Sequence, residues 1–432
     1  MDFYKISVRS PKRGVQEVYP DFKVCRTKDL MVRGKSFYAV WDEEKGLWST
    51  DEYDVARLVD EELNKYAEEL RSKVTDTVVV KSMASFSSNS WKDFKKYMTN
   101  IADNSKQLDT KIVFSNTPVE KKDFISRKLD YPLEKGSIES YERMMNVLYS
   151  PEERQKLEWA IGAIINGDAK TIQKFLVLYG DPGTGKSTIL EIIQKMFNGY
   201  YSIFEAKALT NSNNAFSTEQ FKSNPLIAIQ HDGDLSRIED NSKLNSVISH
   251  EEIVVNEKYK SGYSMRMNCF LFMATNKPVK ITDGKAGLIR RLIDVRPTGD
   301  KLPPDLYYEL IDKIQFELPA IAWHCKQVYE SDPYRYDGYI PTTMLGASND
   351  FYNFIVDNYL VFSTQNGISG KQAWKMYKEY CEESNVKYMH SKIVFEEELK
   401  TYFDTVKTRY KDENGNHHAK YFMGFKKNKF VV

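Results

Sequence analysis

The chain has 432 residues, which corresponds to roughly two or three domains at about 150 residues per domain. Hydrophobic residues make up 41% and charged residues 28%, which excludes an intrinsically disordered protein and a low-complexity fibre. Basic and acidic residues nearly balance, at 62 and 61, so no global field draws the chain to nucleic acid or to an anionic membrane. Any site for a polyanion must therefore be local.

The cysteines and the N-terminus narrow the class of protein further. Four cysteines lie far apart with no C-x-x-C pair, which argues against a disulfide framework and a zinc ribbon. The first residues, MDFYKISVRSPKR, contain no apolar core of a signal peptide, and no window approaches the about 18 apolar residues of a membrane span. The sequence predicts a cytoplasmic protein with no membrane partner.

Residues 1–135 form the first region. The segment FYAVWDEEKGLW at 37–48 predicts two short aromatic strands around a turn. An amphipathic helix is expected to follow, with one face formed by Val55, Leu58, Val59, Tyr66 and Leu70. We expect a small N-terminal α+β module, to which the sequence assigns no role.

Residues 136–335 form the second region. Ser150, Pro151 and Glu153 match an N-cap, a first-turn proline and a capping-box acid, so a helix begins there. Buried strands are expected at 175–179, 226–229 and 270–274, with helices between them and a hairpin at 253–267. This alternation indicates an α/β domain with a parallel sheet.

Residues 340–432 form the third region. Helices are expected near 370–381 and 392–403, followed by two strands at 405–410 and 420–425, which is the outline of a winged-helix-like domain. Residues 407–432 contain seven basic and two acidic residues, which gives a local net charge of +5. Such a patch suits either duplex DNA or a protein partner.

The clearest motif is GDPGTGKS at 180–187, which satisfies G-x-x-x-x-G-K-[ST] after a buried strand and before a helix. The glycines let backbone N–H groups face a triphosphate, Lys186 would reach the β- and γ-phosphates, and Ser187 would bind Mg²⁺. The sequence therefore predicts a site for ATP and Mg²⁺, formed by Gly180, Asp181, Pro182, Gly183, Thr184, Gly185, Lys186, Ser187 and Thr188.

Two later strand ends supply the remaining polar groups of such a site. In LIAIQHDGD, Asp232 ends the expected strand and is the expected Mg²⁺ ligand and water-positioning acid, with Asp234, two residues on, in support. An ordinary Asp-Gly surface turn is the alternative. CFLFMATN ends in Asn276, which would lie beside the γ-phosphate if its strand lies between the other two. A plain strand-ending asparagine is the alternative there.

Two further features add candidate residues. In GLIRR, Arg290 and Arg291 stand next to apolar residues, where a guanidinium reaching a neighbouring subunit's γ-phosphate would explain them. A solvated arginine pair is the alternative. The hairpin at 253–267 carries Lys258, Tyr259 and Lys260 at its tip, a set able to contact a phosphate backbone and stack on a base, although such a tip is usually only solvated.

In this order, GDPGTGKS, LIAIQHDGD, EKYKSGY, FLFMATNKP and GLIRR resemble the superfamily 3 helicases, and more narrowly the phage and poxvirus primase-helicase branch. The similarity covers about residues 150–330 and extends weakly to both flanks. It implies a P-loop, AAA+-like parallel sheet core and a ring, a hexamer in this family, that threads single-stranded DNA through a central pore, 3′ to 5′, as ATP is hydrolysed.

Carried over by residue, the resemblance makes Asp232 the Walker B acid, Asn276 the sensor, Lys258 or Lys260 the pore contact, and Arg291 the preferred finger ahead of Arg290. One departure concerns the acids, because the family usually ends this strand with two adjacent acids where the chain has Asp232-Gly-Asp234. No segment resembles a primase polymerase module, so priming is expected from a separate primase or polymerase, or from an upstream domain.

We therefore expect an ATP-dependent DNA helicase of phage or mobile-element replication, located in the host cytoplasm if phage-encoded. One alternative is a DNA-binding AAA+ initiator or loader that switches conformation without processive unwinding. A second is a non-enzymatic protein with a decayed P-loop, against which the intact Lys186, Ser187 and Asp232 argue.

Overall fold

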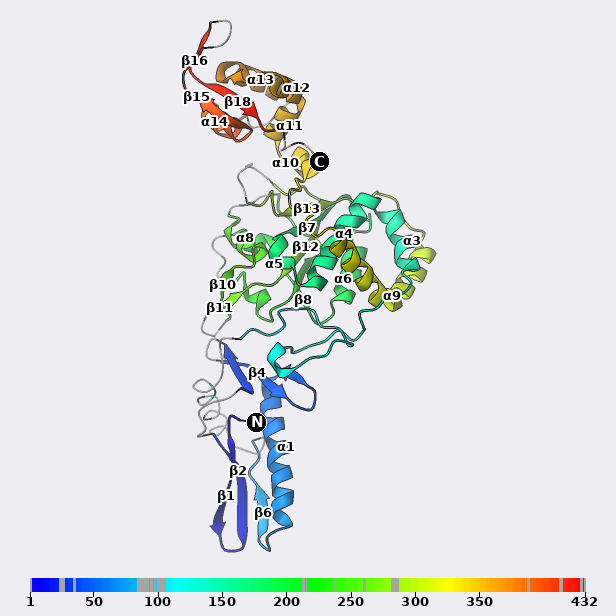
Figure 1. The fold of residues 1–432 in the computed structure, drawn as a ribbon, viewed down its shortest axis with the longest axis vertical. Coiled ribbons are helices and arrows are strands. Elements are labelled where there is room, and N and C mark those ends of the chain that lie inside the picture. The colour runs from blue at the N-terminus through cyan, green and yellow to red at the C-terminus, as the bar shows by residue number, and fades with distance from the viewer. Residues whose placement is uncertain are drawn as a thin grey trace.

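The computed structural model describes residues 2–22, 28–33, 36–83, 106–211, 216–236, 240–258, 262–280, 287–384, 389–411 and 415–427, with single residues at 93, 96, 98, 214, 238, 386 and 430. Figure 1 shows three parts along the long axis of the molecule: an N-terminal module at one end, a helix-flanked sheet in the middle and a C-terminal module at the other end. No helix within the described ranges combines the length and the apolar character that a bilayer crossing requires.

The N-terminal module contains two small sheets and one long helix. Strands β1 (Lys5–Lys12), β2 (Val15–Asp21) and β6 (Thr77–Val80) form one sheet, and β3 (Leu30–Arg33), β4 (Ser36–Asp42) and β5 (Leu47–Ser49) form the other. The expected aromatic hairpin is β4–β5, and the expected helix is α1 (Glu52–Arg71). Asp51 caps α1 by accepting from Tyr53 N, and Val55, Leu58 and Val59 lie in the core with Leu70 packed against it, as predicted. Tyr66 is 38% exposed, because the buried face continues through Leu63 and Ala67, so its predicted place on the apolar face is corrected.

The central sheet has five parallel strands in the order β13-β7-β12-β9-β8. Their bounds are β7 (Phe175–Tyr179), β8 (Tyr201–Ile203), β9 (Ile227–Gln230), β12 (Phe270–Thr275) and β13 (Leu292–Val295). The predicted α/β class and parallel sheet are confirmed. Because all five strands run the same way, the loops that leave their carboxyl ends meet at one edge.

Alternate strand residues point to opposite faces of this sheet, and each face has its own core. Leu176 and Leu178 face helices on one side, and Phe175 and Val177 face the other. The first side is covered by α3 (Glu139–Leu148), α4 (Pro151–Asn166), α5 (Ala169–Ile172), α6 (Lys186–Met196) and α9 (Pro304–Ser331). The second carries α7 (Ala206–Leu209), α8 (Ser242–Ile248) and the hairpin β10 (Glu252–Val255) with β11 (Tyr263–Arg266).

Helix α4 begins at the predicted residue and packs tightly against α9. Ser150 accepts a hydrogen bond from Glu153 N, and Pro151 is the first helical residue. The expected capping box is not formed, because the Glu153 carboxylate accepts from Lys156 Nζ and Arg296 N instead. A Cβ placed on Gly162 would lie 2.1 Å from the carbonyl oxygen of Cys325, so glycine allows the two helix backbones to touch. Elsewhere in the described residues the chain forms two short 3₁₀ turns, at Lys121–Asp123 and Glu219–Phe221.

The C-terminal module has the expected order of two helices followed by strands. Helices α10 (Thr342–Ser348), α11 (Asp350–Asp357) and α12 (Tyr359–Thr364) lead into it, and α13 (Gly370–Glu383) and α14 (Lys392–Thr401) follow. Strand β18 (Tyr421–Phe425) pairs with β14 (Ile368–Ser369) and β15 (Phe403–Lys407), while β16 (Tyr410–Lys411) pairs with β17 (His417–His418). Phe351, Phe354, Tyr377 and Phe395 form its aromatic core.

Candidate functional site

The glycine loop 180–187 joins the carboxyl end of β7 to the first turn of α6. Gly183 and Gly185 have φ of +77° and +88°, a left-handed conformation that glycine adopts at little cost. A Cβ on Gly185 would lie only 2.9 Å from Cδ1 of Leu148, so space also requires glycine there. The loop thus has the backbone shape that the motif predicts.

Lys186 is folded back onto this loop. Its Nζ donates to the carbonyl oxygens of Gly180, at 2.8 Å, and Asp181, at 2.7 Å, and Thr184 also donates to Asp181 O, at 2.8 Å. Burial lowers the pKa of Lys186, and the carboxylates of Asp181 and Asp232 partly oppose this effect. The ammonium group is therefore held by the loop in a position from which it can turn toward an anion.

The other loop residues lie at the start of α6 or at the exposed tip. Asp181, Pro182 and Ser187 are exposed, and Thr188 is half-buried in the first helical turn. The hydroxyl of Ser187 thus stands at the positive end of α6, where an anion such as a phosphate is favoured.

Strand β12 lies between β7 and β9, which is the condition that the sequence analysis set for Asn276. Thr275 pairs with Tyr179 and Met273 with Gln230, so Asn276 and the loop of Asp232 leave the sheet at the same edge as the P-loop. Backbone bonds join the three loops: Gly180 N donates to Thr275 O, at 3.3 Å, and Gly233 N to Ala274 O, at 2.7 Å. Asp232 and Asn276 are both exposed at this edge.

The two acids of the Asp-Gly-Asp segment have different surroundings. Asp234 accepts hydrogen bonds from Lys277 Nζ, at 2.7 Å, and from Ser236 N and Oγ, at 2.9 and 2.5 Å. The Lys277 bond is the main reason that the pKa of Asp234 lies well below its usual range. Asp232 acts by charge on both Lys186 and Lys277. Asp234 is therefore the acid that holds Lys277 by a hydrogen bond, and Asp232 is the more exposed acid of the segment.

The arginine pair requires a correction. The preferred finger Arg291 is only 8% exposed, and its guanidinium donates to Ser249 Oγ, at 2.7 and 3.1 Å, and to Gly287 O, at 2.7 Å. Three internal bonds and burial leave it unable to reach another molecule. Arg290 is exposed, so it becomes the better candidate.

Arg290 also lies on the opposite edge of the sheet from the P-loop of its own chain. The adjacent Arg291 O accepts from Phe175 N, at 2.8 Å, at the first residue of β7, whereas the P-loop leaves after the last residue, Tyr179. At about 3.3 Å per residue, the strand separates the two by more than 10 Å. Any action of Arg290 on a phosphate would therefore be on a neighbouring copy.

The predicted hairpin is β10–β11, with Lys258 exposed where it turns. Tyr259 and Lys260 lie outside the described residues. The N-terminal module reaches strand β11 of this hairpin through Arg33, whose guanidinium lies 3.6 Å from the Tyr38 ring centre and 5.4 Å from that of Tyr263. Arg33 also donates to Sδ of Met265 in β11, at 3.1 Å, so the module and the hairpin are in contact.

The segment after β13 passes over the P-loop, although the sequence did not predict it as part of the site. Pro297 lies against Gly180, and Lys301 Nζ lies 3.9 Å from the point where a Cβ on Gly183 would stand. Thr298 fixes this segment, because its N donates to Leu148 O, at 2.9 Å, and its Oγ1 to Val147 O, at 2.8 Å. The position of VRPTGDK directly after a buried strand of a parallel sheet is the pattern that could have pointed to it.

The chemistry of this edge suits a magnesium nucleotide. Lys186 and Lys301 are cations beside the loop, and the Ser187 hydroxyl and the Asp232 carboxylate are oxygen ligands of the kind that Mg²⁺ prefers. Mg²⁺ usually takes one or two protein oxygens and completes its shell with phosphates and water, so these two residues are a sufficient protein set.

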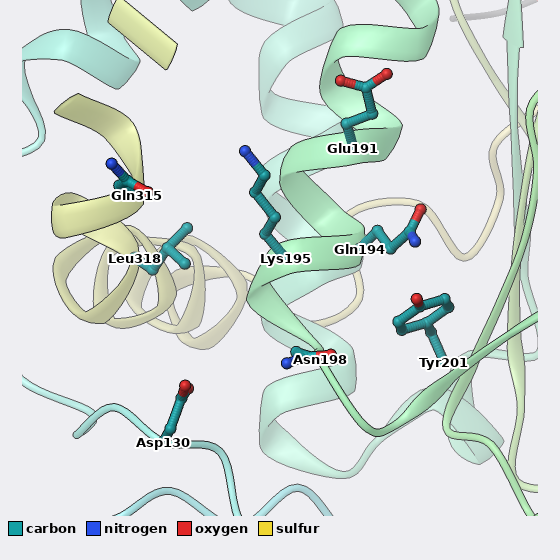
Figure 2. A pocket seen from close by; sticks show the side chains of 8 residues that line it. All are labelled: Asp130, Glu191, Gln194, Lys195, Asn198, Tyr201, Gln315 and Leu318. Carbon is teal, nitrogen blue, oxygen red and sulfur yellow. The ribbon is translucent and has the colours of Figure 1, made fainter. Parts of the chain in front are cut away.

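A separate pocket of about 560 Å³ lies between α6 and α9, and none of the predicted site residues lines it. Figure 2 shows Lys195 of α6 extending toward Gln315 and Leu318 of α9, while Gln194 lies on the other side of α6 near Tyr201. Its lining mixes acids, amides and one lysine. This pocket lies along the C-terminal half of α6, whereas the glycine loop precedes its first turn.

The comparisons with known proteins give limited matches. A family described as "Family of unknown function (DUF5906)" matches residues 178–291, from β7 to Arg291. Among solved structures, "The apo structure of NrS-1 C terminal region (305-718)" is 13% identical over 68% of this chain and 78% of that chain, with a TM-score of 0.41. "The A form apo structure of NrS-1 C terminal region-CTR" is 14% identical with the same coverages and TM-score. These likenesses are too weak to assign a fold or an activity.

Proposed function

We propose that the chain is an ATP-dependent DNA helicase that acts in phage or mobile-element DNA replication, in the cytoplasm of the host. The observation that carries the proposal is the place of β12 between β7 and β9, because it brings the P-loop, Asp232 and Asn276 to one edge of the sheet. A phosphate loop, an acid and an amide at one edge are the parts that hydrolysis of a nucleoside triphosphate needs.

The proposed reaction is attack of water on the γ-phosphate of ATP. The new bond joins the water oxygen to the γ-phosphorus, the bond to the β–γ bridging oxygen breaks, and a proton leaves the water toward the carboxylate of Asp232. Lys186 leaves its loop carbonyls to neutralise charge on the phosphates, and Asn276 orients the water. Mg²⁺, bound by Ser187 and Asp232, would neutralise the charge that develops on the phosphate oxygens.

The proposal includes a ring of subunits, as a hexamer. Arg290 is exposed at the sheet edge opposite the P-loop of its own chain, so it can complete only the site of a neighbouring copy. An arginine supplied in this way stabilises transition-state charge.

The proposed DNA contact is the tip of the β10–β11 hairpin, with Lys258 at its turn and Tyr259 and Lys260 next in the chain. In a ring these tips would surround a single strand in the central pore, with movement 3′ to 5′. In sequence, the hairpin follows the strand that leads to Asp232 and precedes the strand that leads to Asn276. A movement of these two strand ends during ATP hydrolysis would therefore reach the hairpin through a short length of chain. Priming would fall to a separate primase or polymerase.

Steady-state ATP hydrolysis with and without single-stranded DNA tests this function, with Lys186→Ala as the blank. The proposal predicts a Lys186-dependent rate that DNA increases. A Lys186-dependent rate that ignores DNA would favour the switch-like initiator or loader instead, and no such rate at all would reject an ATPase.

A further inference from the structure

The C-terminal module separates its charges onto two neighbouring elements. We call strands β15 to β18, residues 403–425, the C-terminal ribbon. Its exposed cations are Lys407, Arg409, Lys411 and Lys420, against Asp404 among the described residues. The acids Asp412 and Glu413 lie outside the described residues. Figure 1 shows the β16 hairpin at the end of the molecule farthest from the N-terminal module.

The ribbon adds aromatic rings to these cations. Tyr410 stacks on Tyr421 with ring centres 4.3 Å apart, and His418 lies 5.3 Å from Tyr421. Lys407 Nζ lies 5.1 Å from the ring centre of Tyr410. Cations that lie among half-exposed rings suit a phosphate backbone with bases beside it, because the charges bind phosphates and the rings stack.

Helix α14, which precedes the ribbon, has the opposite character. It carries Glu396, Glu397 and Glu398 in succession, and its exposed apolar side chains include Ile393, at 72% exposure, and Val394, at 41%. Glu396 forms an ion pair with Lys420 of the ribbon, and Lys407, Arg409 and Lys411 are the other exposed cations of the ribbon. Helix α14 carries these three acids against two lysines, Lys392 and Lys400, so it attracts a phosphate backbone less than the ribbon does.

We propose that the C-terminal ribbon is a second nucleic-acid contact of this protein, in which Lys407, Arg409 and Lys411 bind phosphates and Tyr410 supports them, while α14 stays outside the contact. This goes beyond the proposed function, which places DNA at the β10–β11 hairpin on the central domain. A strand held at both places would be gripped at two distant points of one chain.

The test is DNA binding by the full chain without nucleotide, followed by fluorescence anisotropy over a series of salt concentrations. The charge-reversed variant is Lys407→Glu/Arg409→Glu/Lys411→Glu. Its matched control, Lys375→Glu/Lys378→Glu/Lys392→Glu, makes the same change in net charge on exposed lysines of α13 and α14 in the same module. A single-stranded and a duplex probe of equal length are compared.

The ribbon variant should bind DNA at least tenfold more weakly, and the slope of log affinity against log salt should fall by about 3, one for each lost phosphate contact. The control should keep the affinity and slope of the unaltered chain. A larger loss on the single strand would indicate stacking, and a larger loss on the duplex would indicate backbone contacts alone; both support the ribbon.

Equal losses in both variants, or none in either, would overturn the proposal, as would a ribbon effect on anionic vesicles without one on DNA. The milder Lys407→Ala/Arg409→Ala/Lys411→Ala variant repeats the test if the reversed charges disturb folding. Because nucleotide is left out, failure of the ATPase would reject the proposed function while leaving the ribbon contact measurable.

Discussion

The ammonium group of Lys277 lies 2.7 Å from Oδ2 of Asp234, directly beyond the strand that carries Asn276. This pair joins the loop after β9 to the loop after β12. Because Asp234 is bound to Lys277, Asp232 is the acid of the Asp-Gly-Asp segment whose charge acts on Lys186. The two acids should therefore respond differently to removal of their charge.

Asp232→Asn should lower ATP hydrolysis by about 100-fold or more, because the variant loses a Mg²⁺ ligand and the acceptor of the water proton. Asp234→Asn should keep hydrolysis within about tenfold, because its carboxylate holds Lys277 and not the nucleotide. Hydrolysis rates at saturating ATP check this order. A greater loss in Asp234→Asn than in Asp232→Asn would reverse the assignment.

The two neighbouring arginines should also separate. Arg291→Ala leaves Ser249 and Gly287 without their buried partner, so it should lower the free energy of unfolding by about 2 kcal/mol or more, as read from denaturant unfolding. Arg290→Ala should leave stability within about 0.5 kcal/mol, because the side chain is exposed, and yet lower hydrolysis.

Mixed subunits show whether Arg290 acts on a neighbour. Arg290→Ala keeps a complete P-loop, and Lys186→Ala keeps Arg290, so mixing the two inactive variants should restore part of the activity. Two variants that stay inactive when mixed, but that assemble, would contradict action in trans.

Lys301 should contribute to nucleotide affinity. Lys301→Ala should weaken ATP binding by about tenfold, the size of one charge-assisted hydrogen bond, while Lys301→Arg keeps most of it. Titration with a fluorescent ATP analogue measures the change. Lys313→Ala is the control, because Lys313 is an exposed α9 lysine paired with Glu309. Equal affinities in Lys301→Ala and the control would remove Lys301 from the site.

His250 should make stability depend on pH. It is buried beside the start of β10, and burial lowers its pKa to about 4. The unfolded chain, with an ordinary pKa near 6.5, binds more protons between these values, so stability is full above about pH 6.5 and falls as pH drops toward 4. The loss should approach about 1.4 kcal/mol per pH unit inside this window.

The matched variant for this effect is His250→Asn, because His250 has φ of +54° and asparagine tolerates that conformation. Urea unfolding at about pH 7.5 and about pH 5 should show a smaller pH dependence in the variant than in the unaltered chain. The same dependence in both would assign the acid loss to other groups.

Local patterns in the sequence predict much of the fold and part of the site. The glycine loop, the helix start at Ser150, the β4–β5 hairpin and the β10–β11 hairpin all depend on residues close together in the chain, and the structure confirms them. Asp232 and Asn276 lie at the edge of the P-loop because β12 lies between β7 and β9. Local patterns do not predict this order of strands, since it is a property of the whole sheet.

The predictions that were wrong or missing depend on contacts between segments that are far apart in the sequence. Adjacent Arg290 and Arg291 look alike in sequence, and the buried one, Arg291, is held by the nearby Gly287 O and by the Ser249 hydroxyl, 42 residues away. Lys277 binds Asp234, which lies 43 residues earlier in the chain. Lys301 lies beside Gly183 because strand β13 lies beside β7. No local pattern carries this information, because it depends on which strands become neighbours.

The most direct test of the central claim is strand displacement from a forked duplex with a free 3′ arm, followed by the release of a labelled strand. The account predicts release that requires ATP, is lost with a non-hydrolysable analogue and is lost in Lys186→Ala. ATP hydrolysis by the unaltered chain without any strand release on this substrate would contradict the helicase and leave an ATP-dependent switch in its place.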